Sequence, residues 1–145
     1  MEYREADGSD LPGLLNLLIQ LKPDDDKLDE GQARKIWEQI QSLGNIRYFL
    51  ALDGDKPVST CNITIIPNLT RGGQPFGLIE NVITDSGYRK RGIGKKVLEM
   101  AINHARWENC YKILLLSSSN LKPAHAFYES LGFSGDTKRG FELRL

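Results

Sequence analysis

The sequence predicts a mixed α/β fold whose sheet contains one parallel pair of strands. Two observations lead to this expectation. Runs rich in β-branched and aromatic residues alternate along the chain with segments of helical periodicity, and the second half has the order strand, helix, strand. A crossover of that kind within one sheet makes the two strands parallel. At 145 residues the chain has the length of one domain with one core, so we expect a single domain over residues 1–145.

The first third of the chain indicates a strand followed by two helices. Residues 1–7 are the strand candidate. Residues 11–21 indicate a helix that Asp10 can cap and that carries Pro12 in its first turn, where proline is tolerated. Residues 28–43 again have helical periodicity, and the expected apolar face of that helix consists of Ile36, Ile40 and Leu43.

The middle of the chain carries the clearest β signal. Residues 46–66 are two β-rich runs around the pair Asp53-Gly54, which favours a tight hairpin turn. Residues 76–85 indicate a further strand. Apolar residues at helical spacing then predict a helix from Gly92 to about Trp107.

The C-terminal third indicates three more elements. Residues 111–119 predict a buried strand, because their apolar run is short and continuous. Residues 120–133 predict a helix with Pro123 near its start, and residues 140–145 predict a last strand.

Bulk properties exclude several classes of protein. Lys plus Arg and Asp plus Glu both number 19, so no net charge attracts the chain to nucleic acid or to an anionic membrane. No apolar run approaches membrane-spanning length, and the acidic N-terminus does not resemble a signal peptide. The two cysteines and two histidines lack metal-ligand spacing, and free thiols favour a reducing compartment. We therefore expect a cytoplasmic protein without a metal.

Basic side chains surround two glycines where the strand 76–85 leads into the next helix. Backbone N–H groups at a helix N-terminus point outward with partial positive charge, and glycine lets an anion approach the main chain. The basic residues are Arg89, Lys90, Arg91, Lys95 and Lys96. A solvated helix start is the structural alternative, but the preceding strand favours a phosphate site.

Three kinds of phosphate loop differ in their spacing. A P-loop needs Lys directly after its second glycine, but Ile93 follows Gly92. A dinucleotide loop needs a third glycine where Val97 stands, and an acidic residue after the next strand, which ends in Leu-Ser-Ser-Ser. Residues 89–94 instead match R/Q-x-x-G-x-G/A, the pyrophosphate loop of the GCN5-related N-acetyltransferase (GNAT) family.

The resemblance to this family extends over about residues 78–133. Residues 79–101 are similar to the family's core strand, loop and helix, and residues 120–133 resemble its later N-x(n)-A-x-x-FYE-x-x-GF segment. The resemblance implies a single N-acetyltransferase domain with a central, mostly antiparallel sheet, one parallel strand pair and about four flanking helices. It also implies direct transfer of an acetyl group from acetyl-CoA to a primary amine of a small molecule or peptide.

The same resemblance implies a cofactor site. The pyrophosphate of acetyl-CoA is expected on Arg89, Lys90, Arg91, Gly92, Ile93, Gly94 and Lys95. Its pantetheine arm is expected to pair, like an added strand, with the edge formed by Val82, Ile83 and Thr84. Asn120 matches the asparagine that bonds to the cofactor arm. A helix cap before Pro123 is its structural alternative.

Glu80 is the candidate catalytic base. An amine with a pKa near 10 must lose a proton before it attacks a thioester. Glu80 is the carboxylate within the strand that leads to the loop, where the family often has a base that acts through water. The alternative is an acid on the wet face of a strand. In a regular strand Glu80 would share a face with apolar Leu78 and Val82, and the family's strand bulge at this level would relieve that.

Tyr128 is the candidate acid. It matches the family's tyrosine that faces the leaving sulfur, where a phenol can hydrogen-bond to the thiolate or protonate it. The alternative is a core position, because Ala124, Phe127 and Leu131 share its helical face.

The sequence indicates the amine acceptor less clearly than the acyl donor. Within the family the chain resembles the glucosamine-phosphate acetyltransferases, but their Glu-Asp pair reads Glu80-Asn81, and Leu116-Ser117 replaces their late acidic residue. The acceptor pocket is expected among the first two helices and the hairpin, where Asp24–Asp26, Trp37 and Tyr48 could meet a cationic amine. A catalytically inactive acyl-CoA sensor and a nucleic-acid adaptor are the alternatives, and the fold makes a homodimer plausible.

Overall fold

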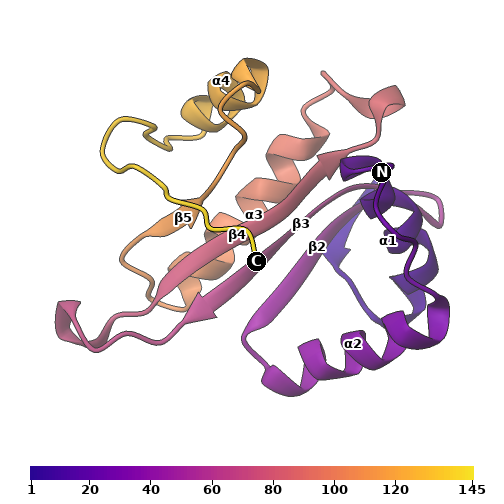
Figure 1. Ribbon diagram of the computed structural model, residues 1–145, viewed down its shortest axis with the longest axis horizontal. Coiled ribbons are helices and arrows are strands. Elements are labelled where there is room, and N and C mark those ends of the chain that lie inside the picture. Colours follow the sequence, from indigo (N-terminus) through magenta and orange to yellow (C-terminus); the bar gives the residue numbers. More distant parts are fainter. The chain divides into compact units, whose positions relative to one another are not determined.

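The computed structural model describes all of residues 1–145 and divides them into two compact units, Met1–Leu114 and Leu115–Leu145. Figure 1 shows the elements along the chain. The first unit holds the N-terminal helices, the sheet and the helix that follows the basic loop. The second unit holds one helix and the C-terminal segment.

Five strands form one sheet in the order β1-β2-β3-β4-β5. The first four pair antiparallel with their neighbours: β1 (Glu2–Glu5), β2 (Ile46–Asp53), β3 (Lys56–Ile66) and β4 (Phe76–Thr84). β5 (Ile113–Leu115) runs parallel to β4. Just before β5, Tyr111 N donates to Pro75 O at 3.0 Å, and Lys112 O accepts a hydrogen bond of 3.0 Å from Gly77 N. The predicted mixed sheet with one parallel pair is confirmed.

The helices number four, besides short 3₁₀ turns. They are α1 (Leu11–Leu18), α2 (Glu30–Leu43), α3 (Ile93–Trp107) and α4 (Lys122–Ser130). The 3₁₀ turns are η1 (Gly8–Asp10), η2 (Ile19–Leu21), η3 (Arg71–Gly73) and η4 (Ser86–Tyr88). None of the helices combines the length and the apolar character that a membrane span requires.

One face of the sheet packs against α1 and α2. The core on this side joins Leu14 of α1 and Trp37 of α2 to Leu50 and Leu52 of β2. The aromatic ring of Trp37 lies 5.7 Å from that of Tyr48, which is also on β2. Because side chains alternate along a strand, the even-numbered residues of β2 face these two helices.

The opposite face of the sheet packs against α3 (Figure 1). The ring of Phe49 lies 5.9 Å from that of His104, and the thiol of Cys61 lies 3.8 Å from the carbonyl oxygen of Val97. The helix predicted from Gly92 to about Trp107 is confirmed, and the apolar residues at helical spacing are on its buried side: Ile93, Val97, Leu98, Ala101 and Ala105. The sheet and α3 therefore fix where the basic loop begins and ends.

The predicted apolar face of α2 was wrong for Ile36 and Leu43, whereas Ile40 is half-buried. Ala33 and Trp37 are the buried residues of this helix, whereas Ile36 and Leu43 are 43% and 66% exposed. The large Trp37 ring packs against Tyr48, so it decides which side of the helix faces the sheet.

Two strand predictions near the C-terminus also need correction. The strand expected over 111–119 is limited to Ile113–Leu115 and is not fully buried, in keeping with its place at the edge of the sheet. Residues 140–145 form no strand, and Phe141, Leu143 and Leu145 are each more than 80% exposed. Alternating apolar residues favour a strand only when a neighbouring strand supplies hydrogen bonds, and the alternation itself does not identify that neighbour.

Asp10 stands at the predicted N-cap position of α1, but its carboxylate does not cap that helix. It accepts two hydrogen bonds from the guanidinium of Arg4, at 2.6 and 2.8 Å, and one from Asp7 N at 2.8 Å. The hydrogen bonds from Arg4 hold the pKa of this buried carboxyl below its ordinary value. Asp10 therefore joins β1 to the start of α1.

Candidate functional site

The strand that carries Glu80 bulges at that residue. Asn62 of β3 pairs with Glu80, but Thr60 pairs with Ile83, so β4 contains one extra residue between these two pairs. Asn81 has a φ of 54°, in the left-handed region that asparagine tolerates better than most residues. The extra residue turns Val82 to the face opposite Glu80. The bulge expected from the family resemblance is therefore present.

Glu80 faces the α1 and α2 side of the sheet. Its pairing partner Asn62 lies opposite Tyr48 of β2, so the three residues form a row across three strands. Tyr48 belongs to the packing of the α1 and α2 core, which fixes the side of the row. Glu80 is exposed, so its carboxylate is accessible from this side.

A hydrogen-bonded trio supports the bulge beside Glu80. Asn81 Nδ2 donates to Asn62 Oδ1 at 2.8 Å, and Asn62 is buried. Tyr48 also forms a hydrogen bond with Asn81. Burial raises the pKa of the Tyr48 phenol, and the bond with Asn81 partly opposes this, as a donated amide N–H does. The side chain of Asn81 is therefore held by two strands of the sheet.

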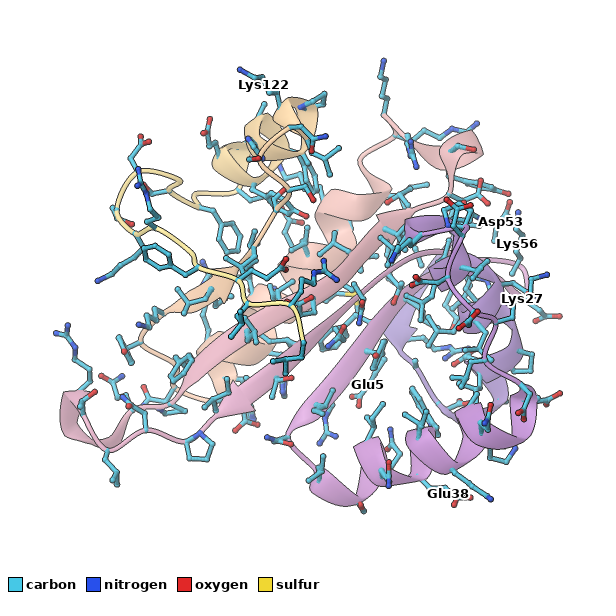
Figure 2. The ribbon with its side chains drawn as sticks, viewed as in Figure 1. Glu5, Lys27, Glu38, Asp53, Lys56 and Lys122 are labelled. Atoms are coloured by element: carbon cyan, nitrogen blue, oxygen red, sulfur yellow. The ribbon has the colours of Figure 1, made fainter.

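A hollow of about 410 Å³ adjoins Asn81. It is lined by the second half of α1, by η2 and by the connection from η2 to α2. Its charged residues are Lys22, Asp25, Asp26 and Lys27. Lys22 Nζ lies 2.9 Å from Asp25 Oδ1, and Figure 2 shows Lys27 between α1 and α2. The hollow contains Asp25 and Asp26, near which the acceptor pocket is expected, but no residue of α2 or of the β2–β3 hairpin, and it carries charges of both signs. Trp37 and Tyr48, which were also expected there, pack against each other in the core instead.

The basic loop leads into an open helix start. Lys90 and Gly92 have φ values of 60° and 73°, and no atom lies within 4 Å of the position that a Cβ on Gly92 would take. No side chain caps α3, and its first turn has no acidic residue. The first N–H groups of a helix have no partner within it, so here they are available to an anion. The loop therefore fits a pyrophosphate group.

The predicted cationic side chains have different neighbours. Arg89 Nε donates to the carbonyl oxygen of Thr84 at 3.0 Å, and the Arg91 guanidinium lies 5.3 Å from the centre of the Tyr88 ring. Lys95 Nζ lies 3.8 Å from Glu99 Oε1, which partly neutralises it. Lys90 is exposed. Arg89 and Arg91 are thus oriented by two residues that precede the loop, Thr84 and Tyr88.

The strand edge predicted for the pantetheine arm lies beyond the bulge. Ile83 and Thr84 pair with Thr60 and Ser59 of β3 on one side. On the other side, the bond from Gly77 N to Lys112 O places the three-residue β5 beside the first half of β4. The second half of β4 therefore has no strand neighbour on that edge, as an added strand requires.

Two of the predicted site residues, Asn120 and Tyr128, belong to the second unit. Asn120 is exposed, and the N-cap of α4 is Leu121 without a side-chain bond, so the helix-cap alternative for Asn120 is not supported. Tyr128 lies on α4, and its ring is 5.5 Å from that of Phe127 and 6.2 Å from that of Phe133. The roles of both residues stay predictions.

Neither cysteine of the first unit is suited to act as an alternative nucleophile. Cys61 is buried in the sheet, and burial raises the pKa of its thiol to about 12. Cys110 also has a raised pKa, because of burial and the nearby Glu108. Both cysteines are free thiols. Neither favours the thiolate that covalent catalysis requires.

The sequence did not identify several residues of this region as site residues. Asn62 and Tyr88 are the clearest, together with Asp53, whose Oδ2 accepts a hydrogen bond of 2.7 Å from the Tyr88 hydroxyl. Each acquires its role through a partner at least 19 residues away, and only the folded chain brings such partners together. The position of Tyr88 directly before the motif was the one available signal.

Comparisons with known proteins agree with this geometry. Residues 11–133 match the model of the acetyltransferase (GNAT) family. The glucosamine 6-phosphate N-acetyltransferase of Trypanosoma brucei brucei is 33% identical over 134 residues, which are 92% of this chain and 88% of that protein.

Solved structures show the same fold. A putative acetyltransferase from Agrobacterium tumefaciens is 40% identical, with a TM-score of 0.95 and complete coverage of both chains. A predicted acetyltransferase from Clostridium acetobutylicum, solved with acetyl-CoA, is 25% identical, with a TM-score of 0.78 and coverage of 99% and 95%. The family match, the basic loop before α3 and the bulge in β4 agree, and the chain belongs to the GNAT family as an acetyl-CoA-dependent N-acetyltransferase.

Proposed function

We propose that this acetyltransferase acts on the primary amine of a small acceptor that also carries an anionic group, of the amino-sugar phosphate class. The observation that carries the proposal is the hollow lined in part by Asn81, the residue that follows the candidate base, because this hollow contains both signs of charge. Its volume of about 410 Å³ lies in the range of small-molecule sites. The 33% identical relative from Trypanosoma brucei brucei carries the name of an enzyme for such an acceptor.

The charges of the hollow suit the two ends of such a molecule. Asp25 and Asp26 attract an ammonium group, whereas Lys22 and Lys27 attract a phosphate. Because Lys22 is paired with Asp25, Lys27 is the more available cation for the phosphate. An acceptor with only one charge would interact with only one sign of this charge set.

Acetyl-CoA supplies an activated thioester when it is bound. In the proposed reaction Glu80 removes a proton from the acceptor amine, directly or through a water molecule, so that the nitrogen lone pair can form the new N–C bond. The bulge leaves backbone N–H groups of β4 unpaired, and one of them can stabilise negative charge on the carbonyl oxygen. Tyr128 supplies a proton or a hydrogen bond to the departing sulfur.

The cofactor residues proposed are those of the loop and the strand edge. Arg89 and Arg91 bind the pyrophosphate together with the N–H groups that begin α3, and Lys90 and Lys95 add charge around it. Val82, Ile83 and Thr84 pair with the amide groups of the pantetheine arm, and Asn120 bonds to the same arm.

An acceptor panel tests the proposal. Thiol release from acetyl-CoA would be measured with glucosamine 6-phosphate, glucosamine and a lysine peptide at equal concentrations. We expect kcat/KM for glucosamine 6-phosphate to exceed that for glucosamine by about ten-fold or more, the equivalent of one favourable charge interaction. A peptide as the best acceptor would contradict the proposal, and binding of acetyl-CoA without turnover of any amine would favour the sensor alternative.

Lys27→Gln sharpens the same test. We expect the variant to lose most of the preference for the phosphorylated acceptor, while Lys35→Gln, an exposed lysine on α2 outside the hollow, retains it. Equal preferences in both variants would mean that the phosphate is not bound in this hollow.

A further inference from the structure

The pyrophosphate loop is joined to the distant β2–β3 hairpin through one side chain. Tyr88 ends η4, directly before the basic residues, and its hydroxyl donates to Asp53 Oδ2 at 2.7 Å. Asp53 is the last residue of β2, at the tight turn into β3. The hydrogen bond therefore connects residues 35 positions apart in the sequence.

The ring of Tyr88 also supports cations. The Arg91 guanidinium carbon lies 5.3 Å from the ring centre, and Lys56 Nζ lies 5.4 Å from it. Both distances are within the range of cation–π attraction. Figure 2 shows Asp53 and Lys56 next to each other at the end of the hairpin. The hairpin thus holds Tyr88 by its hydroxyl, and the ring of Tyr88 holds Arg91.

A second set of bonds fixes Asp85, the N-cap residue of η4. Asp85 accepts a hydrogen bond from Gly87 N at 3.0 Å and one from Gln20 Nε2 at 3.2 Å, and Lys56 Nζ lies 3.5 Å from its Oδ2. The bond from Gly87 is the main reason that the pKa of Asp85 lies below its ordinary value. Both ends of the turn over residues 85–88 are therefore tied to other elements.

We propose that Tyr88 is a positioning residue for the binding of acetyl-CoA. Asp53 fixes the Tyr88 ring, and this ring places the Arg91 guanidinium where it can bind the pyrophosphate. The inference rests on the proposed role of the loop. A free arginine side chain loses much rotamer entropy when it binds a phosphate, and an arginine that already rests on a fixed ring loses less. The contact between the Tyr88 ring and Arg91 is therefore expected to increase the affinity for acetyl-CoA.

Two properties favour this role over a purely structural one. Asp53 and Arg91 are exposed and Tyr88 is half-buried, and single polar interactions at such positions contribute little to the free energy of unfolding. The Tyr88 phenol is a neutral donor around neutral pH, and the hydrogen bond to Asp53 raises its pKa further above its ordinary value.

The test compares two substitutions of Tyr88 with a control. Tyr88→Phe keeps the ring and removes the bond to Asp53, and Tyr88→Leu removes both. Tyr111→Leu is the control, because the Tyr111 ring also lies near two cations, Arg71 at 5.5 Å and Lys112 at 5.1 Å, outside the loop. KM and kcat would be measured with acetyl-CoA and with S-acetylpantetheine, a donor that lacks the pyrophosphate and nucleotide.

We expect Tyr88→Phe to raise the KM for acetyl-CoA about three-fold and Tyr88→Leu about ten-fold, with kcat and the S-acetylpantetheine reaction unchanged. Tyr111→Leu is expected to change neither donor. Equal losses with both donors, or no change in Tyr88→Leu, would overturn the inference. Failure of the wild-type protein to bind acetyl-CoA in a calorimetric titration would instead overturn the proposed cofactor loop, and the inference with it.

Discussion

Glu80 and Asn81 have different tasks although they are neighbours. Asn81 takes the left-handed backbone conformation of the bulge and is held by Asn62 and Tyr48. Glu80 precedes the bulge and stays exposed on the side of the hollow. The bulge gives a carboxylate a fixed backbone position without burying it, and this arrangement suits a group that must exchange protons with an amine.

Replacement of Glu80 by Gln tests its role as base. We expect kcat/KM for the acceptor to fall by about 100-fold or more at neutral pH, because most of the amine is protonated and no carboxylate removes the proton. Calorimetry should give an unchanged affinity for acetyl-CoA. Part of the lost rate should return as the pH rises and the free amine becomes more abundant. Glu38→Gln, an exposed acid on α2, is the control (Figure 2). A Glu80 variant as active as that control would remove Glu80 from the mechanism.

Substitution of Asp10 tests how much its buried carboxylate contributes to the free energy of unfolding. Asp10→Asn removes a buried carboxylate that accepts bonds from Arg4 and Asp7 N, so we expect the free energy of unfolding to fall by about 2 kcal/mol. The bonds from Arg4 lower the pKa of Asp10 in the folded protein. Its stabilisation is therefore fully present above the unfolded carboxyl's pKa of about 4 and is lost as the pH falls through the folded value.

Chemical denaturation of both proteins across the acid range checks this prediction. The difference in free energy of unfolding between wild type and Asp10→Asn should be constant near neutral pH and should shrink at acid pH. A difference that grows toward acid pH would contradict the assigned direction of the pKa change.

At the scale of elements, the sequence predicted those whose signal is local. The hairpin follows from Asp53-Gly54 between β-rich runs, and α3 follows from its apolar spacing and from Gly92. The orientation of α2 and the absence of a strand over 140–145 could not be predicted, because each depends on what packs or pairs with the segment. The same limit applies to the trio of Tyr48, Asn62 and Asn81.

The start of α3 can be tested by a matched pair of glycine substitutions. Gly92 and Gly44 have nearly the same φ, 73° and 72°, and neither has an atom within 4 Å of a Cβ position. Alanine at either position should lower the free energy of unfolding by about 1 kcal/mol, the cost of a left-handed conformation. Only Gly92→Ala should weaken acetyl-CoA binding, because only Gly92 lies in the loop. Equal affinities in the two variants would place the pyrophosphate elsewhere.

At the scale of the whole molecule, the free cysteines bear on whether the reaction passes through a covalent acyl-enzyme intermediate. Neither thiol suits an acyl-enzyme intermediate, so the acetyl group is expected to pass directly between two bound substrates. Initial rates at varied concentrations of both substrates should give intersecting double-reciprocal lines. Parallel lines would indicate a covalent intermediate. The single domain, the cytoplasmic location and the homodimer that the sequence analysis expects stay predictions.

The most direct test of the account is a calorimetric titration of the wild-type protein with acetyl-CoA at low salt, with NAD and ATP as controls. We predict saturable binding of acetyl-CoA at one site per chain and no comparable binding of the controls, because the loop has the spacing of a CoA pyrophosphate site. No binding of acetyl-CoA, or equal binding of all three ligands, would contradict the assignment of residues 89–95 as the cofactor loop.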